Sequence, residues 1–245
     1  MLHRNPPWGA WWNLGKNIIV MRFFCAALLA GFAALALPFD GQERLLPKML
    51  KDLNTARTAA DSGDYAKAEA LVQLVRCPDI KVELPADATK EQKEALVEAA
   101  AIWENALHGA IDFQIVEPGQ GQVRVGFMKD VFFAGVASMG RATWNRQLVN
   151  FGWGNYGTHI SASIEVRTQL FGKECRKEEI RHALAHELGH VLGLDDSSKL
   201  GDIMGPHNPE RPATAPSYEE AAALSELHWE AYQIEMVAKL AQPGK

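Results

Sequence analysis

One short run, His-Glu-Leu-Gly-His at residues 186–190, constrains this chain of 245 residues more than any other feature. His186 and His190 are four residues apart, so on a helix both imidazoles lie on one face and can reach a common point. Two converging imidazoles supply half of a tetrahedral zinc site. Glu187 directly follows the first histidine, which places its carboxylate beside the metal, where it can take a proton from an activated water. The run therefore predicts a helix that carries a catalytic zinc site.

Gly193 and Asp196 extend this site beyond the helix. Glycine tolerates positive φ, so Gly193 can end the helix and turn the chain back toward the metal. Asp196 then supplies a carboxylate oxygen as the third ligand, and the fourth position stays open for water and substrate. The alternative is an amphipathic helix that carries two histidines on its polar side.

These residues resemble the zinc signature HExxHxxGxx(H/D) of the metzincin metallopeptidases, and Met204 is placed like the methionine of their Met-turn. Residues 186–195 are most similar to the matrixins, whereas an aspartate as third ligand, here Asp196, resembles the snapalysin-type enzymes. The resemblance implies a metzincin-like catalytic domain over residues 78–245. Its expected fold is α+β, with a mixed twisted sheet of about five strands, an active-site helix, a Met-turn and a C-terminal helix. It also implies that Met204 forms an apolar base beneath the metal and is not a ligand.

The resemblance and the intact Glu187 favour a secreted zinc endopeptidase, in which Glu187 is first the general base and then the general acid. Two alternatives are a zinc-stabilised binding protein without activity and a maturation peptidase of narrow specificity. The expected cofactor is zinc; structural calcium is a further option, although no Asp-rich loop of EF-hand type is present. The expected partner is a protein or peptide substrate, and we expect a monomer. A net charge of −5 without a basic block gives no indication of nucleic-acid binding.

Residues 1–36 contain an apolar run that is interrupted once, by Arg22. The part after Arg22 has the length of a signal-peptide core and is short for a membrane span, and Ala-Leu-Ala at residues 34–36 fits the small-x-small cleavage rule. These features predict export to a secreted or periplasmic location. The alternative is an uncleaved signal anchor that tethers the protein to a membrane.

Residues 37–77 are expected to form a helical propeptide or a permanent N-terminal extension. Apolar residues repeat at helical spacing on both sides of a turn at residues 61–64, which predicts a helical hairpin. A hairpin of this size buries little surface alone, so we expect it to pack on the catalytic domain.

Two cysteines follow the signal segment, Cys77 and Cys175. In an exported protein the default is one disulfide between them. Arg-Cys-Pro-Asp at residues 76–79 also resembles a shortened form of the matrixin cysteine switch, in which a propeptide thiolate keeps a zymogen inactive. The family pattern has additional residues between its cysteine and aspartate. Unrelated free thiols are the third option.

The periodicity after residue 78 alternates between strands and helices. It predicts strands at 80–84, 112–116, 122–127, 135–144 and 159–166, and helices at 89–108, 177–192 and, opened by a capping box, 217–238. Residues 155–158 are expected to be a loop, and the last helix is expected to pack on the zinc helix. By its order in the chain, the stretch 138–144 is the candidate edge strand for an extended substrate, through Ser138, Gly140 and Ala142. The alternative is an ordinary edge strand or loop.

Two further histidines lie near the motif. His182 precedes His186 by one turn, so it could bind a second metal, bond to a ligand or be an ordinary solvated residue. His207 closely follows the Met-turn and could assist an oxyanion.

Overall fold

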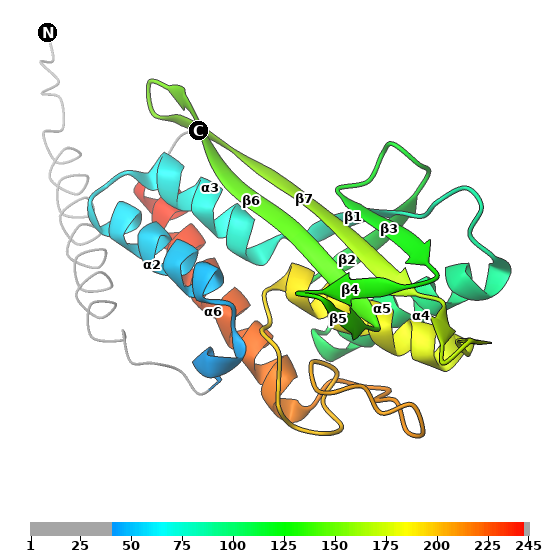
Figure 1. The fold of residues 1–245 in the computed structure, drawn as a ribbon. Helices are drawn as coiled ribbons and strands as arrows, with labels where there is room; N and C mark the ends of the chain where they lie inside the picture. Colours follow the sequence, from blue (N-terminus) through cyan, green and yellow to red (C-terminus); the bar gives the residue numbers. More distant parts are fainter. Residues whose placement is uncertain (1–40, 243–245) are drawn as a thin grey trace, which may run out of the picture. The chain divides into compact units, whose positions relative to one another are not determined.

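Five strands form a mostly parallel sheet in the order β2-β1-β3-β7-β6 (Figure 1). Parallel pairs join β1 to β2, β1 to β3 and β3 to β7, whereas β6 runs antiparallel to β7 and forms one edge. The structure is a computed structural model that describes residues 41–242. The predicted mixed sheet of an α+β fold is confirmed. The strands are β1 (Asp79–Glu83), β2 (Asp112–Val116), β3 (Val123–Met128), β6 (Gly140–Gly152) and β7 (Asn155–Arg167).

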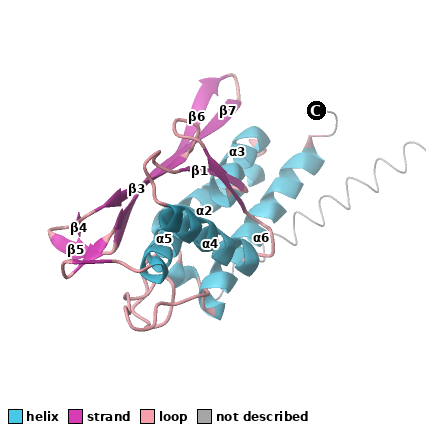
Figure 2. Cartoon of the chain, turned by 90° about the vertical axis from the view of Figure 1, so that its right-hand side faces the viewer, coloured by secondary structure: helices cyan, strands magenta, loops and turns pink. Residues whose placement is uncertain are grey.

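One face of the sheet is apolar because alternate strand residues point to the same side. The buried residues of this face are Ile80, Val82, Phe113, Val123, Val125, Ala162, Ile164 and Val166. Figure 2 shows the helices gathered on one side of the sheet. Next to the sheet, α4 (Lys90–Ala106) packs against α5 (Lys177–Leu192). Thr89 begins α4 with a capping box, in which its side chain accepts from the Gln92 N–H.

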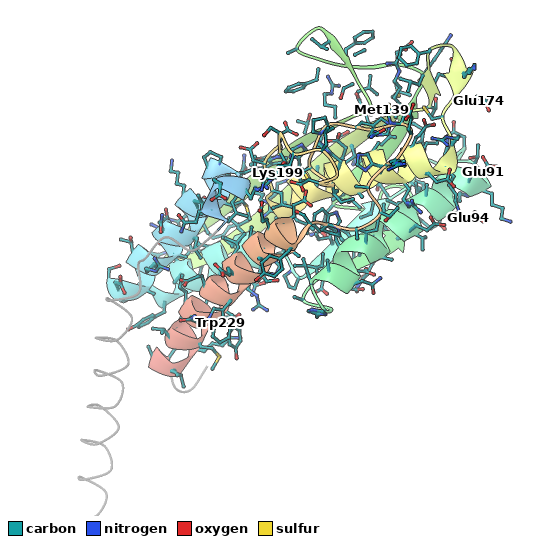
Figure 3. All side chains as sticks on the ribbon, turned by 90° about the horizontal axis from the view of Figure 1, so that it is seen from below. Glu91, Glu94, Met139, Glu174, Lys199 and Trp229 are labelled. Carbon is teal, nitrogen blue, oxygen red and sulfur yellow. The ribbon has the colours of Figure 1, made fainter. Side chains whose placement is uncertain are left out.

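The N-terminal helices belong to the same compact unit as the sheet. After the short 3-10 helix η1 (Gln42–Arg44), α2 (Pro47–Asp61) and α3 (Tyr65–Arg76) pack on each other and on α6 (Tyr218–Ala241), as expected of a small hairpin. The expectation that the last helix packs on the zinc helix is wrong, because α6 lies against α3 and α2 instead. The opposite face of α6 carries exposed Trp229 (Figure 3).

Strands β6 and β7 continue as a long two-stranded ribbon beyond the sheet, toward α3 (Figure 1). The expected loop at residues 155–158 is wrong: these residues pair with β6. Gly-Trp-Gly at residues 152–154 makes the turn instead, with φ values of 85°, 55° and 73°. Glycine adopts such positive φ at little cost, so this triplet was the signal for the turn.

The predicted strand 135–144 is divided at Met139. Its first part, β5 (Val136–Ser138), pairs with β4 (Val131–Phe133), and its second part begins β6. A second short hairpin joins β8 (Gln169–Leu170) to β9 (Lys173–Glu174). Ser138 therefore lies in a hairpin beside the edge strand, whereas Gly140 and Ala142 lie on the edge strand itself.

The predicted signal segment, residues 1–36, lies outside the described residues. Within residues 41–242, no helix is long and apolar enough to cross a membrane.

The expected disulfide is wrong, because Cys77 and Cys175 are both free. Cys77 ends α3 and is buried, whereas Cys175 follows β9 and is half-buried. The packing of α3 encloses the first thiol.

Candidate metal centre

Helix α5 places His186 and His190 one turn apart, as predicted, and its observed bounds match the predicted ones. The two ring centroids are 4.9 Å apart and the rings are nearly perpendicular. The helix ends at Gly193, which has a φ of 115° and so reverses the chain without strain. This turn brings residue 196 back alongside the helix.

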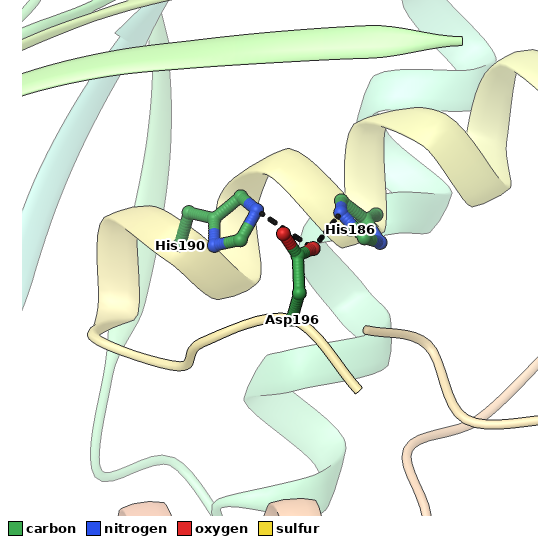
Figure 4. Close-up of side chains that lie close together, drawn as sticks. All are labelled: His186, His190 and Asp196. Carbon is green, nitrogen blue, oxygen red and sulfur yellow. Dashed lines mark ion pairs between the residues drawn. The ribbon is translucent and has the colours of Figure 1, made fainter. Parts of the chain in front are cut away.

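Asp196 completes a group of three side chains (Figure 4). Its Oδ1 lies 3.2 Å from His186 Nε2 and 3.5 Å from His190 Nε2. Within residues 41–242 this is the one cluster of three or more His, Cys, Asp or Glu side chains whose ligand atoms could hold a metal ion. The Asp196 side chain is 72% exposed, so the group is open to solvent on that side.

The hydrogen bonds of the two rings determine which nitrogens face the group. His186 Nδ1 lies 2.9 Å from the carbonyl of Ile203, and His190 Nδ1 lies 2.9 Å from that of Leu194. A carbonyl can only accept, so each Nδ1 carries the hydrogen and each Nε2 of a neutral ring presents a lone pair.

When a ring also carries a hydrogen on Nε2, it donates to Asp196, and these contacts from His186 and His190 hold the pKa of Asp196 well below its ordinary value, so Asp196 is ionised at neutral pH. Two lone pairs and a carboxylate therefore converge on one point. A divalent cation satisfies all three, and the donor set of two imidazoles and one carboxylate fits a catalytic metal with an open position.

Glu187 lies outside the ligand group and faces strand β6. It is buried, and a Cβ atom at Gly140 would lie only 2.3 Å from its Oε1, so the absence of a side chain at Gly140 makes room for the carboxylate. Burial raises the pKa of Glu187. The charges of His186 and His190 and the hydrogen bond from the backbone N–H of Ala142 lower it, but they do not cancel the effect of burial. A carboxylate with a raised pKa is a stronger base than an exposed one.

A backbone carbonyl orients each of the two histidines. The N–H of the same peptide group donates a hydrogen bond to another residue, which holds that carbonyl in place. The peptide that accepts from His186 is that of Ile203 and Met204, and the Met204 N–H donates to Glu220 Oε1 at 2.7 Å. Glu220, in the capping box of α6, is fully buried. Such chains strengthen each hydrogen bond and fix the ring orientation.

Met204 lies beneath the helix segment between the two histidines. It is buried, and a Cβ atom at Gly189 would lie 2.3 Å from its Sδ and 3.0 Å from Trp103 Cζ2. Met204 is not a member of the ligand group. Met204 therefore packs against the helix segment that carries both histidines.

Gly189→Ala is expected to destabilise the protein by about 1–3 kcal/mol, because the new methyl group overlaps the Met204 sulfur. Without that overlap, the same change inside a helix would stabilise by about 0.5–1 kcal/mol. Urea unfolding gives the free energy for each variant. Gly126→Ala is the control, since its Cβ atom would meet nothing closer than 3.9 Å. A Gly189→Ala protein as stable as the wild type would show that Met204 does not pack there.

Two pockets flank the ligand group of His186, His190 and Asp196. One, of about 420 Å³, is lined by Met139, Met204 and Pro206 among others, and the other, of about 230 Å³, by Leu46, Phe133 and Trp144 among others. Both include Ser138, Gly140, His186, Glu187 and Asp196. The predicted edge-strand residues thus border the site, and Ala142 lines the smaller pocket.

His182 and His207 line the larger of these pockets. They form its wall on the side of α5 away from His190. Their ring centroids are 5.0 Å apart. The buried Nδ1 of His182 has no hydrogen-bond partner, and neither ring nitrogen of His207 has one. Burial lowers the pKa of His182 to about 4 and also lowers that of His207, so both rings are neutral. They do not join a cluster of three ligands within the described residues, so a second metal at His182 is not supported.

Cys77 does not approach the metal group, which contradicts a cysteine switch in this structure. It lines neither flanking pocket, and its side chain is buried. Burial raises the pKa of its thiol and so disfavours the thiolate that such a switch needs.

Three residues that support the site were not identified from the sequence: Arg44, Arg146 and Glu220. Arg146, on β6, is buried and donates to the carbonyls of Leu74 and Val191 at the ends of α3 and α5. Such contacts join residues far apart in the chain, so no spacing rule reveals them. For Glu220 the capping box was a signal for the helix start, but not for its bonds to the backbone N–H groups of Ile203 and Met204.

Neither the models of known protein families nor the curated proteins include a match to this chain.

Proposed function

We propose that this protein is a zinc-dependent endopeptidase of the metzincin type, similar to the matrixins. The observation that carries the proposal is the convergence of three metal-binding acceptors, from His186, His190 and Asp196, beside the buried carboxylate of Glu187. Two imidazoles, one carboxylate and an open side are typical of catalytic zinc. The signal-like residues 1–36 support an exported enzyme.

Bound zinc would supply Lewis acidity, which polarises a peptide carbonyl and makes a water molecule more acidic. Glu187 accepts the water proton on its carboxylate and later donates it to the nitrogen of the leaving amine. Its burial next to Gly140 keeps the carboxylate oriented toward the site.

The edge of the sheet supports binding of an extended peptide. Strand β6 ends the strand order, so its outer backbone groups lack a neighbouring strand in the sheet. An extended peptide can pair with such an edge, and the two flanking pockets then receive side chains on either side of the cleaved bond.

The first test is the metal content and the casein cleavage of the purified protein. We expect one zinc per chain, cleavage of casein, loss of cleavage in a chelator and recovery when zinc is added back. Absence of bound zinc would contradict the metal centre. Zinc without cleavage of casein or of a mixed peptide library would favour the zinc-stabilised binding protein instead.

The pair His182 and His207 predicts a polar side chain next to the cleaved bond. These ring nitrogens have no exposed surface, so a substrate hydroxyl or amide reaches one only when the His207 ring turns toward the pocket. The new hydrogen bond then recovers the cost of an unpaired buried nitrogen, about 1–3 kcal/mol. We therefore expect peptides with Asn, Gln, Ser or Thr at this subsite to be cleaved roughly 5- to 150-fold more efficiently than those with Leu.

His207→Phe should reverse that preference toward apolar side chains, because the phenyl ring offers no hydrogen bond. The measurement is kcat/KM over a peptide library that varies the residues flanking the cleaved bond. His159→Phe is the matched control, since His159 is exposed on β7. An unchanged profile for His207→Phe would show that this wall does not select the substrate.

A further inference from the structure

The segment before α2 pairs with the chain that leads from the zinc helix to Asp196. The Leu46 N–H donates to the Gly193 carbonyl, and the Asp195 N–H donates to the Arg44 carbonyl, both at 2.8 Å. These bonds lie on either side of an isolated antiparallel bridge between Leu45 and Leu194. Residues 193–195 are therefore held by a segment from the beginning of the described chain.

The Arg44 side chain holds the chain on the other side of Asp196. Its Nη1 donates to Ser197 Oγ at 2.6 Å and to Asp202 Oδ2 at 2.9 Å, and its Nη2 donates to Glu219. Ser197 Oγ also donates to Asp202 Oδ2, at 2.7 Å. Arg44 and Asp202 are 8% and 6% exposed. Loss of one partner from such a buried charge pair is costly, so this contact is a strong restraint on residues 197–202.

Asp196 thus lies between two restrained positions while its own side chain is exposed. Asp195 is tied to the Arg44 backbone and Ser197 to the Arg44 guanidinium. A metal ligand on a loop keeps its geometry only when neighbouring contacts fix that loop.

The same segment also reaches His190 and the substrate pockets. The Leu194 carbonyl that accepts from His190 belongs to the peptide whose N–H donates to Arg44. The side chain of Met49 packs over Gly193, where a Cβ atom would be 2.7 Å from Met49 Cγ. Leu46 lines the smaller pocket beside the metal group.

We propose that residues 41–49 are a permanent part of the metal centre, with Arg44 as a positioning residue for Asp196; this rests on the proposed function for the presence of zinc. The N-terminal helices are then an extension that the active protein retains. They are not a propeptide that is removed to activate it.

The test compares zinc affinities of full-length variants, measured by competition with a chromophoric chelator. Arg44→Met should bind zinc about 10- to 100-fold more weakly than the wild type. Arg57→Met is the matched control, because Arg57 pairs α2 with Glu230 of α6 away from the site. The zinc affinity of Arg57→Met should stay within about 2-fold of that of the wild type, which is the scatter expected of such comparisons.

A double-variant cycle separates positioning of Asp196 from general damage. In an Asp196→Ala background, Arg44→Met should cause no further loss, since the ligand that it positions is gone. The visible spectrum of the Co²⁺-loaded Arg44→Met protein should shift toward that of Asp196→Ala. Arg44→Lys, which keeps a donor for Asp202, should recover part of the affinity.

Three results overturn the inference. These are wild-type affinity in Arg44→Met, an equal loss in the Asp196→Ala background, or an equal loss in Arg57→Met. If the wild type binds no zinc, the proposed function itself fails. If the wild type binds zinc and Arg44→Met binds it equally well, only the role of Arg44 fails. If Arg44→Met does not fold, Ser197→Ala takes its place, because it removes one Arg44 contact and keeps the pair with Asp202. Its zinc affinity should fall in the wild-type background and not in Asp196→Ala.

Discussion

Glu187→Gln should reduce peptide cleavage by about 100- to 10,000-fold while the zinc content stays that of the wild type. Glutamine keeps the shape of the side chain in the space beside Gly140, but its amide cannot accept the proton from water. Glu187 is not a member of the ligand group, so the metal should remain bound. The measurement pairs kcat/KM on casein-derived peptides with the metal content of the same sample.

Glu178→Gln is the matched control for this change, because Glu178 is an exposed residue on the same helix. It should cleave at the wild-type rate. Undiminished cleavage by Glu187→Gln would show that another group accepts the proton.

His190→Ala should abolish the stabilisation that zinc gives to the folded protein. A metal present at about 1,000 times its Kd stabilises the native state by about 4 kcal/mol, which raises the melting temperature. Removal of one of the three proposed ligands, and of its bond to Leu194, should leave no such rise at the same zinc concentration. Thermal unfolding with and without zinc measures the effect.

The control for this experiment is His159→Ala, which removes an exposed histidine on β7 and should keep the full zinc response. A zinc response in His190→Ala equal to that of the wild type would place the metal at another set of residues.

Predictions that depended on local signals agree with the structure. Helix α5 and strand β2 have the predicted bounds, and Ser217 opens α6 with the predicted capping box. Helical spacing places His186 and His190 together, and Gly193 turns the chain as its lack of a Cβ atom allows. These features are decided within a few residues of the chain, so their signals are present in the sequence.

Predictions that depended on contacts between distant segments were less successful. The turn at residues 152–154, rather than a loop at 155–158, follows from the pairing of β6 with β7. Packing of α3 encloses the Cys77 thiol, and α6 lies on α2 and α3 instead of α5.

The candidate site divides in the same way. Residues that present ligands or a base lie within one motif, and their spacing and chemistry identify them without coordinates. The residues that hold them in place, Arg44 and Glu220, lie far from the motif in sequence, at the start of the described chain and on the last helix. Their contacts form only when the chain is folded, because each joins a buried charge to backbone or side-chain groups that no local rule brings together.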